Sequence, residues 1–233
     1  MSRIVPGIVL VALLLLVAPG AGAKTRECDG LQVCVPVAGP WVLVPLGSGA
    51  RKPTVEFQLT CPRGYIVGGL DAELSARQIE VRFLGRLGSP VNPGISTGRS
   101  VVFVARYVGE GARAPSFRPR VGCMPAAGGG VRVPTAASAV PPGEPVVRRV
   151  RTARVRPGTT RIAVACRGRE RLVGASHALG FLRGSPPSPS LAATLSASRF
   201  STGRRALLTV LADAELGGVR ALAQLHALCG VGR

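Results

Sequence analysis

The sequence predicts an all-β protein made of two tandem β-sandwich-like units, each closed by one disulfide bond. Three observations lead to this prediction. Apolar and polar residues alternate with period two in several short segments, which is typical of strands that are buried on one face. The chain contains 31 glycines and 20 prolines, which separate these segments. Several features also recur at one fixed offset and divide the chain into two similar halves.

Residues 1–23 have the features of a secretory signal peptide. Arg3 supplies a positive charge, an uncharged apolar run follows, and small residues end at Ala23, so we expect cleavage before Lys24. A retained membrane anchor is the alternative. It is disfavoured because the apolar run has about 15 residues where a spanning helix needs about 20, and because Pro19 interrupts it. We therefore expect a secreted or cell-wall-associated protein with no membrane span after cleavage.

An internal repeat organises the rest of the chain. Cys61 and Cys166 lie 105 positions apart, and the same offset relates two Ser-Thr-Gly-Arg motifs, Ser96–Arg99 and Ser201–Arg204. Several features that share one offset indicate two copies of one unit.

The repeat divides the mature chain into five segments. The two units span residues 36–123 and 141–229, and the N-terminal segment that precedes them (24–35) contains Cys28 and Cys34. The units are joined by a linker rich in proline, glycine and alanine (124–140) and followed by a short tail (230–233).

Strand patterns occur in both units. In the first unit they cover Thr54–Cys61, Ile79–Phe83 and Ser100–Ala105, and in the second Thr160–Cys166 matches the first of these. The segment Leu207–Cys229 could form helix on propensity alone, and only the comparison with the first unit favours strand.

The six cysteines all lie after residue 23, and an even number in an exported chain predicts three disulfides. A duplicated unit should repeat its own bond. The expected pairs are Cys61 with Cys123, Cys166 with Cys229, and Cys28 with Cys34. Each of the two disulfides that close the larger loops should stabilise the fold by about 4 kcal/mol.

The stretch Cys61–Gly69 reads Cys-Pro-Arg-Gly-Tyr-Ile-Val-Gly-Gly. Together with Cys123 it resembles small cysteine-stapled β-sandwich repeats found in secreted proteins of high-GC bacteria. The second unit departs from this pattern, because Arg167 replaces the proline and Ala175 replaces the second glycine. The resemblance supports the fold and the disulfides. It implies no functional residues, because the group has no settled activity.

No arrangement of residues typical of an enzyme is present in the sequence. The histidines, His177 and His226, are expected at the surface or at loop ends. Asp71 and Glu73 are the only carboxylates whose spacing places them on one strand face, and we expect them to be solvated. We therefore predict no catalytic residue, cofactor or metal site. The alternative is a secreted, carbohydrate-active hydrolase that uses Asp71 and Glu73, or His177.

The formal net charge is +19, from 30 Lys and Arg against 11 Asp and Glu, and such a field attracts polyanions. The second unit contains a dense arginine track, whose counterpart in the first unit, Trp41–Leu46, is apolar. Guanidinium groups bind phosphate, sulfate and carboxylate. The residues predicted to bind a polyanion are Arg148, Arg149, Arg151, Arg154, Arg156, Arg161, Arg167, Arg169 and Arg171.

These patterns predict a non-catalytic binding or structural protein of the cell exterior, with weak adhesion to an anionic envelope polymer through the arginine track. Specific nucleic-acid binding is disfavoured, because only 4% of residues are aromatic and none lies within the track. A further alternative is a purely structural protein whose charge only confers solubility.

Overall fold

The computed structural model describes residues 25–47, 52–84, 98–111, 113–126 and 146–231. Within these ranges almost all regular structure is β-strand, as the sequence predicts, with one short helix, α1 (Pro189–Ala193), and one 3-10 turn, η1 (Ala214–Leu216). The predicted signal peptide and residues 127–140 of the predicted linker lie outside the described residues.

Strands of the first half include the three segments in which the sequence pattern predicts them. In order along the chain they are β1 (Val35–Ala38), β2 (Trp41–Leu43), β3 (Thr54–Thr60), β4 (Tyr65–Leu74), β5 (Ile79–Leu84), β6 (Ser100–Tyr107) and β7 (Ser116–Pro125). The last strand continues to Pro125, two residues beyond the predicted end of the unit.

The second half is also built from strands. They are β8 (Val146–Val155), β9 (Gly158–Ala165), β10 (Glu170–Phe181), β11 (Leu195–Thr202), β12 (Arg205–Ala212) and β13 (Ala221–Val231). The segment Leu207–Cys229 thus forms parts of β12 and β13 with η1 between them, so strand is the correct choice. Its helical propensity is overridden because alternate residues of both strands pack into one core.

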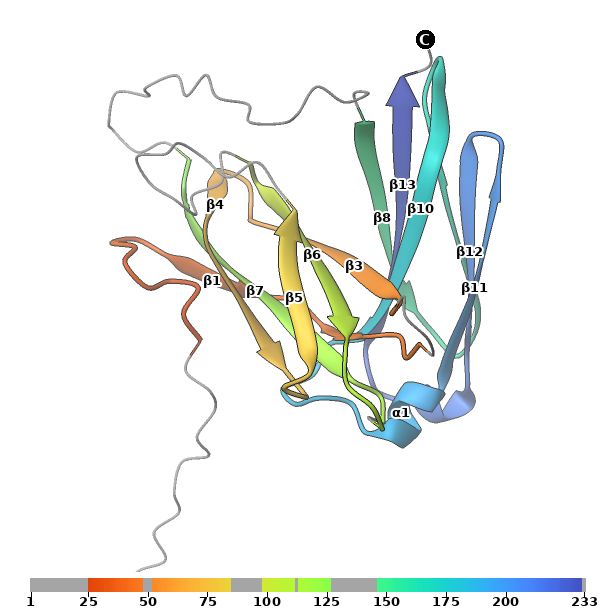
Figure 1. The fold of residues 1–233 in the computed structure, drawn as a ribbon, viewed down its shortest axis with the longest axis horizontal. Coiled ribbons are helices and arrows are strands. Elements are labelled where there is room, and N and C mark those ends of the chain that lie inside the picture. Colours follow the sequence, from red (N-terminus) through yellow and green to blue (C-terminus); the bar gives the residue numbers. More distant parts are fainter. Residues whose placement is uncertain (1–24, 48–51, 85–97, 112, 127–145, 232–233) are drawn as a thin grey trace, which may run out of the picture.

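The strands form three antiparallel sheets (Figure 1). One sheet has seven strands in the order β1-β7-β2-β10-β13-β8, with β4 also paired to β7. The others have three strands each, in the orders β3-β6-β5 and β11-β12-β9. The seven-stranded sheet contains strands from both halves, so the two units share one sheet, which the repeat pattern did not reveal.

The short strand β2 joins the two halves. Val42 lies opposite Phe117 of β7 on one side and Gly180 of β10 on the other. Val42 packs into the first hydrophobic core, while its neighbour Leu43 packs against the second. Trp41 lies opposite Phe181 and is only 3% exposed, so it belongs to this junction.

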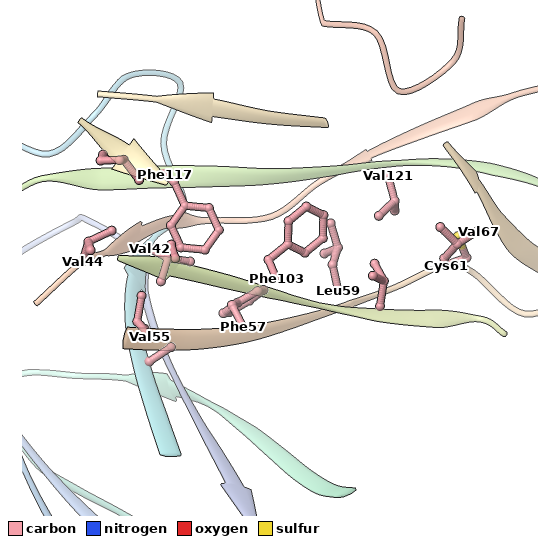
Figure 2. Packing of buried hydrophobic residues seen from close by; sticks show 14 of the residues in the cluster. Val42, Val44, Val55, Phe57, Leu59, Cys61, Val67, Phe103, Phe117 and Val121 are labelled. Atoms are coloured by element: carbon pink, nitrogen blue, oxygen red, sulfur yellow. The ribbon is translucent and has the colours of Figure 1, made fainter. Parts of the chain in front are cut away.

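Each three-stranded sheet encloses a core against its half of the large sheet. In the first core Phe57, Phe103 and Phe117 pack at the centre (Figure 2). In the second core small residues of β13 face the leucine and valine side chains of β12, including Leu208 and Val210. These cores explain the alternation in β3 and β12, where every second residue is buried.

Disulfides join Cys61 to Cys123, Cys166 to Cys229, and Cys28 to Cys34, the pairs expected from the repeat. The first two close loops with sequence separations of 62 and 63, and their sulfur-bearing residues are buried in the two cores.

Candidate functional site: an arginine cluster at one end of the second half

The predicted arginine track runs through three strands of the second half. Four of its nine residues lie on β8, one on β9, one on β10, and three in the turns between them. β8 is an edge strand of the large sheet, and successive side chains along a strand point to opposite faces. The structure therefore does not place the nine residues on one surface.

Arg148 lies where the two halves meet. Its Nη1 is 2.5 Å from Oε2 of Glu56 on β3 and 2.8 Å from Nδ1 of His226 on β13. The hydroxyl of Ser176 donates to the same carboxylate oxygen at 2.6 Å. Burial alone would raise the pKa of Glu56, but the hydrogen bonds from Arg148 and Ser176 outweigh it and lower that pKa. Arg148 therefore forms an ion pair within the protein.

His226 extends this contact into a polar network. Its Nε2 lies 2.7 Å from Oε1 of Gln224, which also accepts the main-chain N–H of Gln58 at 2.6 Å. A carbonyl oxygen can only accept, so Nε2 of His226 carries the proton and Nδ1 accepts from Arg148. Burial, with Arg148 as the second cause, lowers the pKa of His226 to about 4. The ring is therefore neutral at pH 7.

The expectation of a surface histidine is wrong for His226, because its side chain is wholly buried. The physical reason is that β13 lies between two partner strands and is covered on both faces, by the second core and by β3 of the first half. Gln224 makes the latter contact directly, since its Nε2 donates to the main-chain oxygen of Gln58 at 3.1 Å.

Two further arginines of β8 bind partners within the second half. Arg149 donates from Nε and Nη2 to the carboxylate of Glu170, at distances of 2.6 to 3.1 Å. Arg151 donates from Nη1 to the main-chain oxygen of Ala163 on β9 at 3.4 Å. β8 and β9 are edge strands of two different sheets, so Arg151 links the sheets across the side of the sandwich. With Arg148, three of the four arginines on β8 contribute to the fold.

A basic surface forms instead where two turns of the second half meet. The turn between β9 and β10 holds Arg167 and Arg169, and Arg204 and Arg205 lie where β11 passes into β12. Cys166 joins these segments: its N–H donates to the oxygen of Arg204 at 2.9 Å, and Nη2 of Arg204 donates to its oxygen at 3.1 Å. All four arginines are exposed. Both turns lie at the end of the second half that carries the C-terminus (Figure 1).

Arg171, at the start of β10, completes the group that we call the arginine cluster. Its members are Arg167, Arg169, Arg171, Arg204 and Arg205. Glu170 is the only carboxylate in the two turns, both of which the structure describes in full. The hydrogen bond from Arg149, and then the one from the main-chain N–H of Arg167, lower the pKa of Glu170. This carboxylate is thus already paired with Arg149.

Only part of the predicted track contributes to this cluster. Arg154 lies at the opposite end of the second half, opposite Leu222 near the start of β13, and Arg156 follows it in the turn to β9. Arg161 lies in the middle of β9. Conversely, Arg204 and Arg205 were not among the predicted residues. Arg204 ends the second Ser-Thr-Gly-Arg motif, which marks the repeat, but only the pairing of β9 with β12 brings Arg204 and Arg205 beside Cys166.

Both carboxylates of the alternative hydrolase hypothesis have hydrogen-bond partners in the structure. Asp71 accepts the main-chain N–H of Arg26 at 2.8 Å. Glu73 forms ion pairs with Arg120 and, at 3.7 Å, with Arg118. The two carboxylates line an open hollow of about 600 Å³ together with Trp41, Ser185 and Pro186. Glu73 is therefore charge-paired, whereas Asp71 is bound by main-chain N–H groups.

His177 lies elsewhere in the molecule. It lines a hollow of about 320 Å³ with Thr54, Leu179 and Arg199, which does not include Asp71 or Glu73. Burial, and then the charge of Arg199, lower the pKa of His177. Among the described residues its Nδ1 has no hydrogen-bond partner. The structure thus does not bring the candidate histidine and the candidate carboxylates into one site.

One group of potential metal ligands occurs among the described residues. Sγ of Cys166, Sγ of Cys229 and the carboxylate of Glu170 lie within 4.8 Å of one another. The two sulfurs are bonded to each other as a disulfide, so neither is a thiolate that could bind a metal. Glu170 is the residue already bound by Arg149.

Comparison with known proteins gives no match: neither a family model nor a curated protein resembles the chain. In the part of the chain that the structure describes, no helix is both long and apolar enough to cross a membrane.

Proposed function

We propose that this protein is an exported, non-catalytic module that binds an anionic polymer of the cell envelope through the arginine cluster. The observation that carries the proposal is the meeting of the two turns at Cys166, which brings the exposed residues Arg167, Arg169, Arg204 and Arg205 to one end of the second half, where the carboxylate of Glu170 already has a partner. Guanidinium groups bind phosphate, sulfate and carboxylate through two parallel hydrogen bonds, so a polyanion would contact several of them at once.

Export is supported by the signal features of residues 1–23 and by the three disulfides, which persist in oxidising compartments. A non-catalytic role is supported by the separate positions of the hydrolase candidates, with Asp71 and Glu73 in one hollow and His177 in another. Sequence motifs of known catalytic centres are absent from the printed sequence.

The test compares two variants that remove the same charge from opposite ends of the second half. The cluster variant changes Arg167, Arg169 and Arg205 to Ser. The control variant changes Arg154, Arg156 and Arg220 to Ser, where Arg220 adjoins the start of β13. None of these six side chains forms an ion pair among the described residues. Arg148, Arg149 and Arg151 are left intact, because changing them would also perturb the fold.

The protein, purified after export from a secreting host, is applied to heparin and to a purified anionic wall polymer and eluted with salt. We expect the wild-type and control proteins to elute at similar salt concentrations and the cluster variant to elute at a clearly lower one. Each lost contact to the polymer lowers the affinity, so less salt is needed to release the protein. Equal elution of the two variants would mean that net charge alone attracts the polymer. Absence of retention at physiological salt would favour the purely structural alternative.

A further inference from the structure

The sheet β11-β12-β9 has one face that is not covered by any described part of the protein. Its inner face supplies Ala206, Leu208 and Val210 of β12 to the second core. On the outer face of an antiparallel sheet polar residues are the norm, yet β12 places Leu207 and Leu211 there, 39% and 52% exposed.

The exposed apolar side chains are grouped by strand pairing. Leu207 lies directly opposite Phe200 on β11 and opposite Ala163 on β9, so the three residues form a row across the whole sheet. Phe200 is 64% exposed, the largest exposed fraction among the large apolar side chains of the described residues. Leu211 lies two rows away on the same face, between Ser196 and Thr159.

Two arginines flank the apolar row on this same face. Arg205 lies in the adjacent row with Thr202 and Ala165, and Arg161 lies in the row on the other side. The registers place no acidic residue on this face, whose three strands are described in full.

The corresponding sheet of the first half has a different outer face. On it, Arg106 of β6 forms an ion pair with Glu80 of β5 at 2.6 Å, and Glu56 of β3 pairs with Arg148. Arg82 of β5 is also on this face, which thus carries two acidic residues beside its arginines, whereas the β11-β12-β9 face carries none.

We propose that the outer face of β11-β12-β9 docks on the surface of an anionic lipid bilayer. In this arrangement Phe200, Leu207 and Leu211 enter the boundary between headgroups and acyl chains, while Arg161 and Arg205 contact lipid phosphates. Aromatic and leucine side chains gain free energy when they leave water for this boundary, and each nearby arginine adds attraction to anionic lipid. The long arginine side chains reach the phosphates while their methylene groups lie along the apolar row.

Charge also argues against a second copy of the chain as the occupant. Two copies of this face brought together would place Arg161 and Arg205 of one copy against the same unneutralised arginines of the other, and like charges in contact are unfavourable. A lipid surface offers both the negative charge and the apolar layer. The arginine cluster, by contrast, could bind a polymer without any apolar contact, and the two proposals share only Arg205.

The experiment measures co-sedimentation of the exported protein with vesicles of phosphatidylcholine alone and with vesicles that contain phosphatidylglycerol. The docking variant changes Phe200, Leu207 and Leu211 to Ser. The matched control changes three apolar residues of similar exposure elsewhere, Leu46, Leu84 and Val146, to Ser. Both variants keep every charge and the same N-terminus, so electrostatic attraction and any effect of the N-terminal residues are common to all three proteins.

We expect wild-type and control proteins to bind the anionic vesicles and not the neutral ones, and the docking variant to lose at least about tenfold in partition coefficient. Circular dichroism checks that the folds are unchanged. Equal binding of the docking variant and the wild type would overturn the proposal, because attraction by charge alone would then suffice. Absence of wild-type binding to anionic vesicles would overturn it as well, as would a wild-type dimer that the docking variant converts to a monomer without any vesicle binding.

Discussion

Two long strand pairs occupy the same place in the two halves of the molecule, but different segments cover them. Both pairs, β4 with β7 and β10 with β13, contain a disulfide-bonded cysteine, and the register shifts at Val67–Gly69 in one and at Leu172–Gly174 in the other. These shifts lie 105 positions apart. They place His177 level with Ala72.

In the first half the cover is the N-terminal segment. The main-chain oxygen of Glu27 lies so close to Gly69 and Gly122, which face each other across the strands, that a Cβ on either would be 1.9 Å from it. Arg120 of β7 donates to the Glu27 carboxylate at 2.9 Å. The glycines are therefore needed for the close approach of this segment.

In the second half the corresponding face is covered by β3 of the first half. Leu228 lies opposite Gly174, whereas Gly122 lies opposite Gly69. Farther along β13, Gln224 makes the polar contact to the first half, and His226 binds both Gln224 and Arg148. The same face of the two strand pairs is thus covered in both halves. Because the second cover is the first half itself, it also fixes the two halves to each other.

The largest expected effect comes from breaking the second cover. Arg148→Met removes the partner of both Glu56 and His226 and should lower the free energy of unfolding by about 3 kcal/mol, because a partly buried carboxylate is left unpaired. Urea unfolding measures this. Arg154→Met is the matched control on the same strand and should change stability by at most about 0.5 kcal/mol. Equal effects would show that the ion pair does not hold the halves together.

Acid should weaken the same cover. The pKa of His226 is about 4 in the folded protein against an ordinary value of 6.5, so between these values the unfolded chain binds a proton that the folded chain does not. The free energy of unfolding should therefore fall by about 2 to 3 kcal/mol as pH decreases from 7 to 4.5. The lowered pKa of Glu56 acts below this window, since its ordinary value is 4.5.

Urea titrations of His226→Gln and His177→Gln at pH 7 and pH 4.5 assign this acid sensitivity. We expect most of the pH dependence to disappear in His226→Gln and to persist in His177→Gln. The pKa of His177 is also lowered in the wild type, so this variant tests whether that histidine contributes. The reverse result would place the sensitive group outside the contact between the halves.

The contact between the N-terminal segment and the first half can be tested by adding one methyl group to a glycine in each half. Gly69→Ala should cost about 2 kcal/mol, because the new Cβ collides with main-chain atoms of Glu27 and displaces the N-terminal segment. Gly174→Ala should cost less than about 1 kcal/mol, because its nearest neighbour is the side-chain Cδ1 of Leu228 at 3.4 Å. Limited proteolysis within residues 25–34 should accelerate only in the first variant. Similar behaviour of both variants would remove the contrast between the covers.

The smallest effect concerns a contact that the halves share. Nη2 of Arg99 donates to the oxygen of Cys61, and Nη2 of Arg204 to that of Cys166, both at 3.1 Å. Arg99→Met and Arg204→Met should each lower the free energy of unfolding by about 1 kcal/mol, the usual net value of one hydrogen bond, as measured by urea unfolding. Clearly unequal losses would argue against an equivalent environment in the two halves.

The sequence predicted the features that depend on local pattern and on the repeat. Alternation located β3 and β5, β-branched and aromatic residues located β6, and the duplication predicted the pairs Cys61–Cys123 and Cys166–Cys229. The common sheet was not predictable, because β2 has only three residues and its partner Phe181 lies far along the chain.

The structure also explains why Trp41–Leu46 is apolar while the matching segment of the second unit is rich in arginine. β2 is central in its sheet and contributes to both cores, whereas β8 is an edge strand, and charged side chains on an edge prevent pairing with other chains. The candidate site was predicted only in part. Arg167, Arg169 and Arg171 were found by charge density, but Arg204 joins them through the pairing of β9 with β12, which no local pattern encodes.

The position of β2 has a consequence for the order of folding. Trp41 leaves the ribosome long before its neighbour Phe181 is made, so the edge of the first half must wait for the second half to be synthesised. Contacts between residues so far apart form late, because the intervening chain must be ordered first. The sole tryptophan lies at this seam, and its fluorescence should therefore report the slowest phase of refolding.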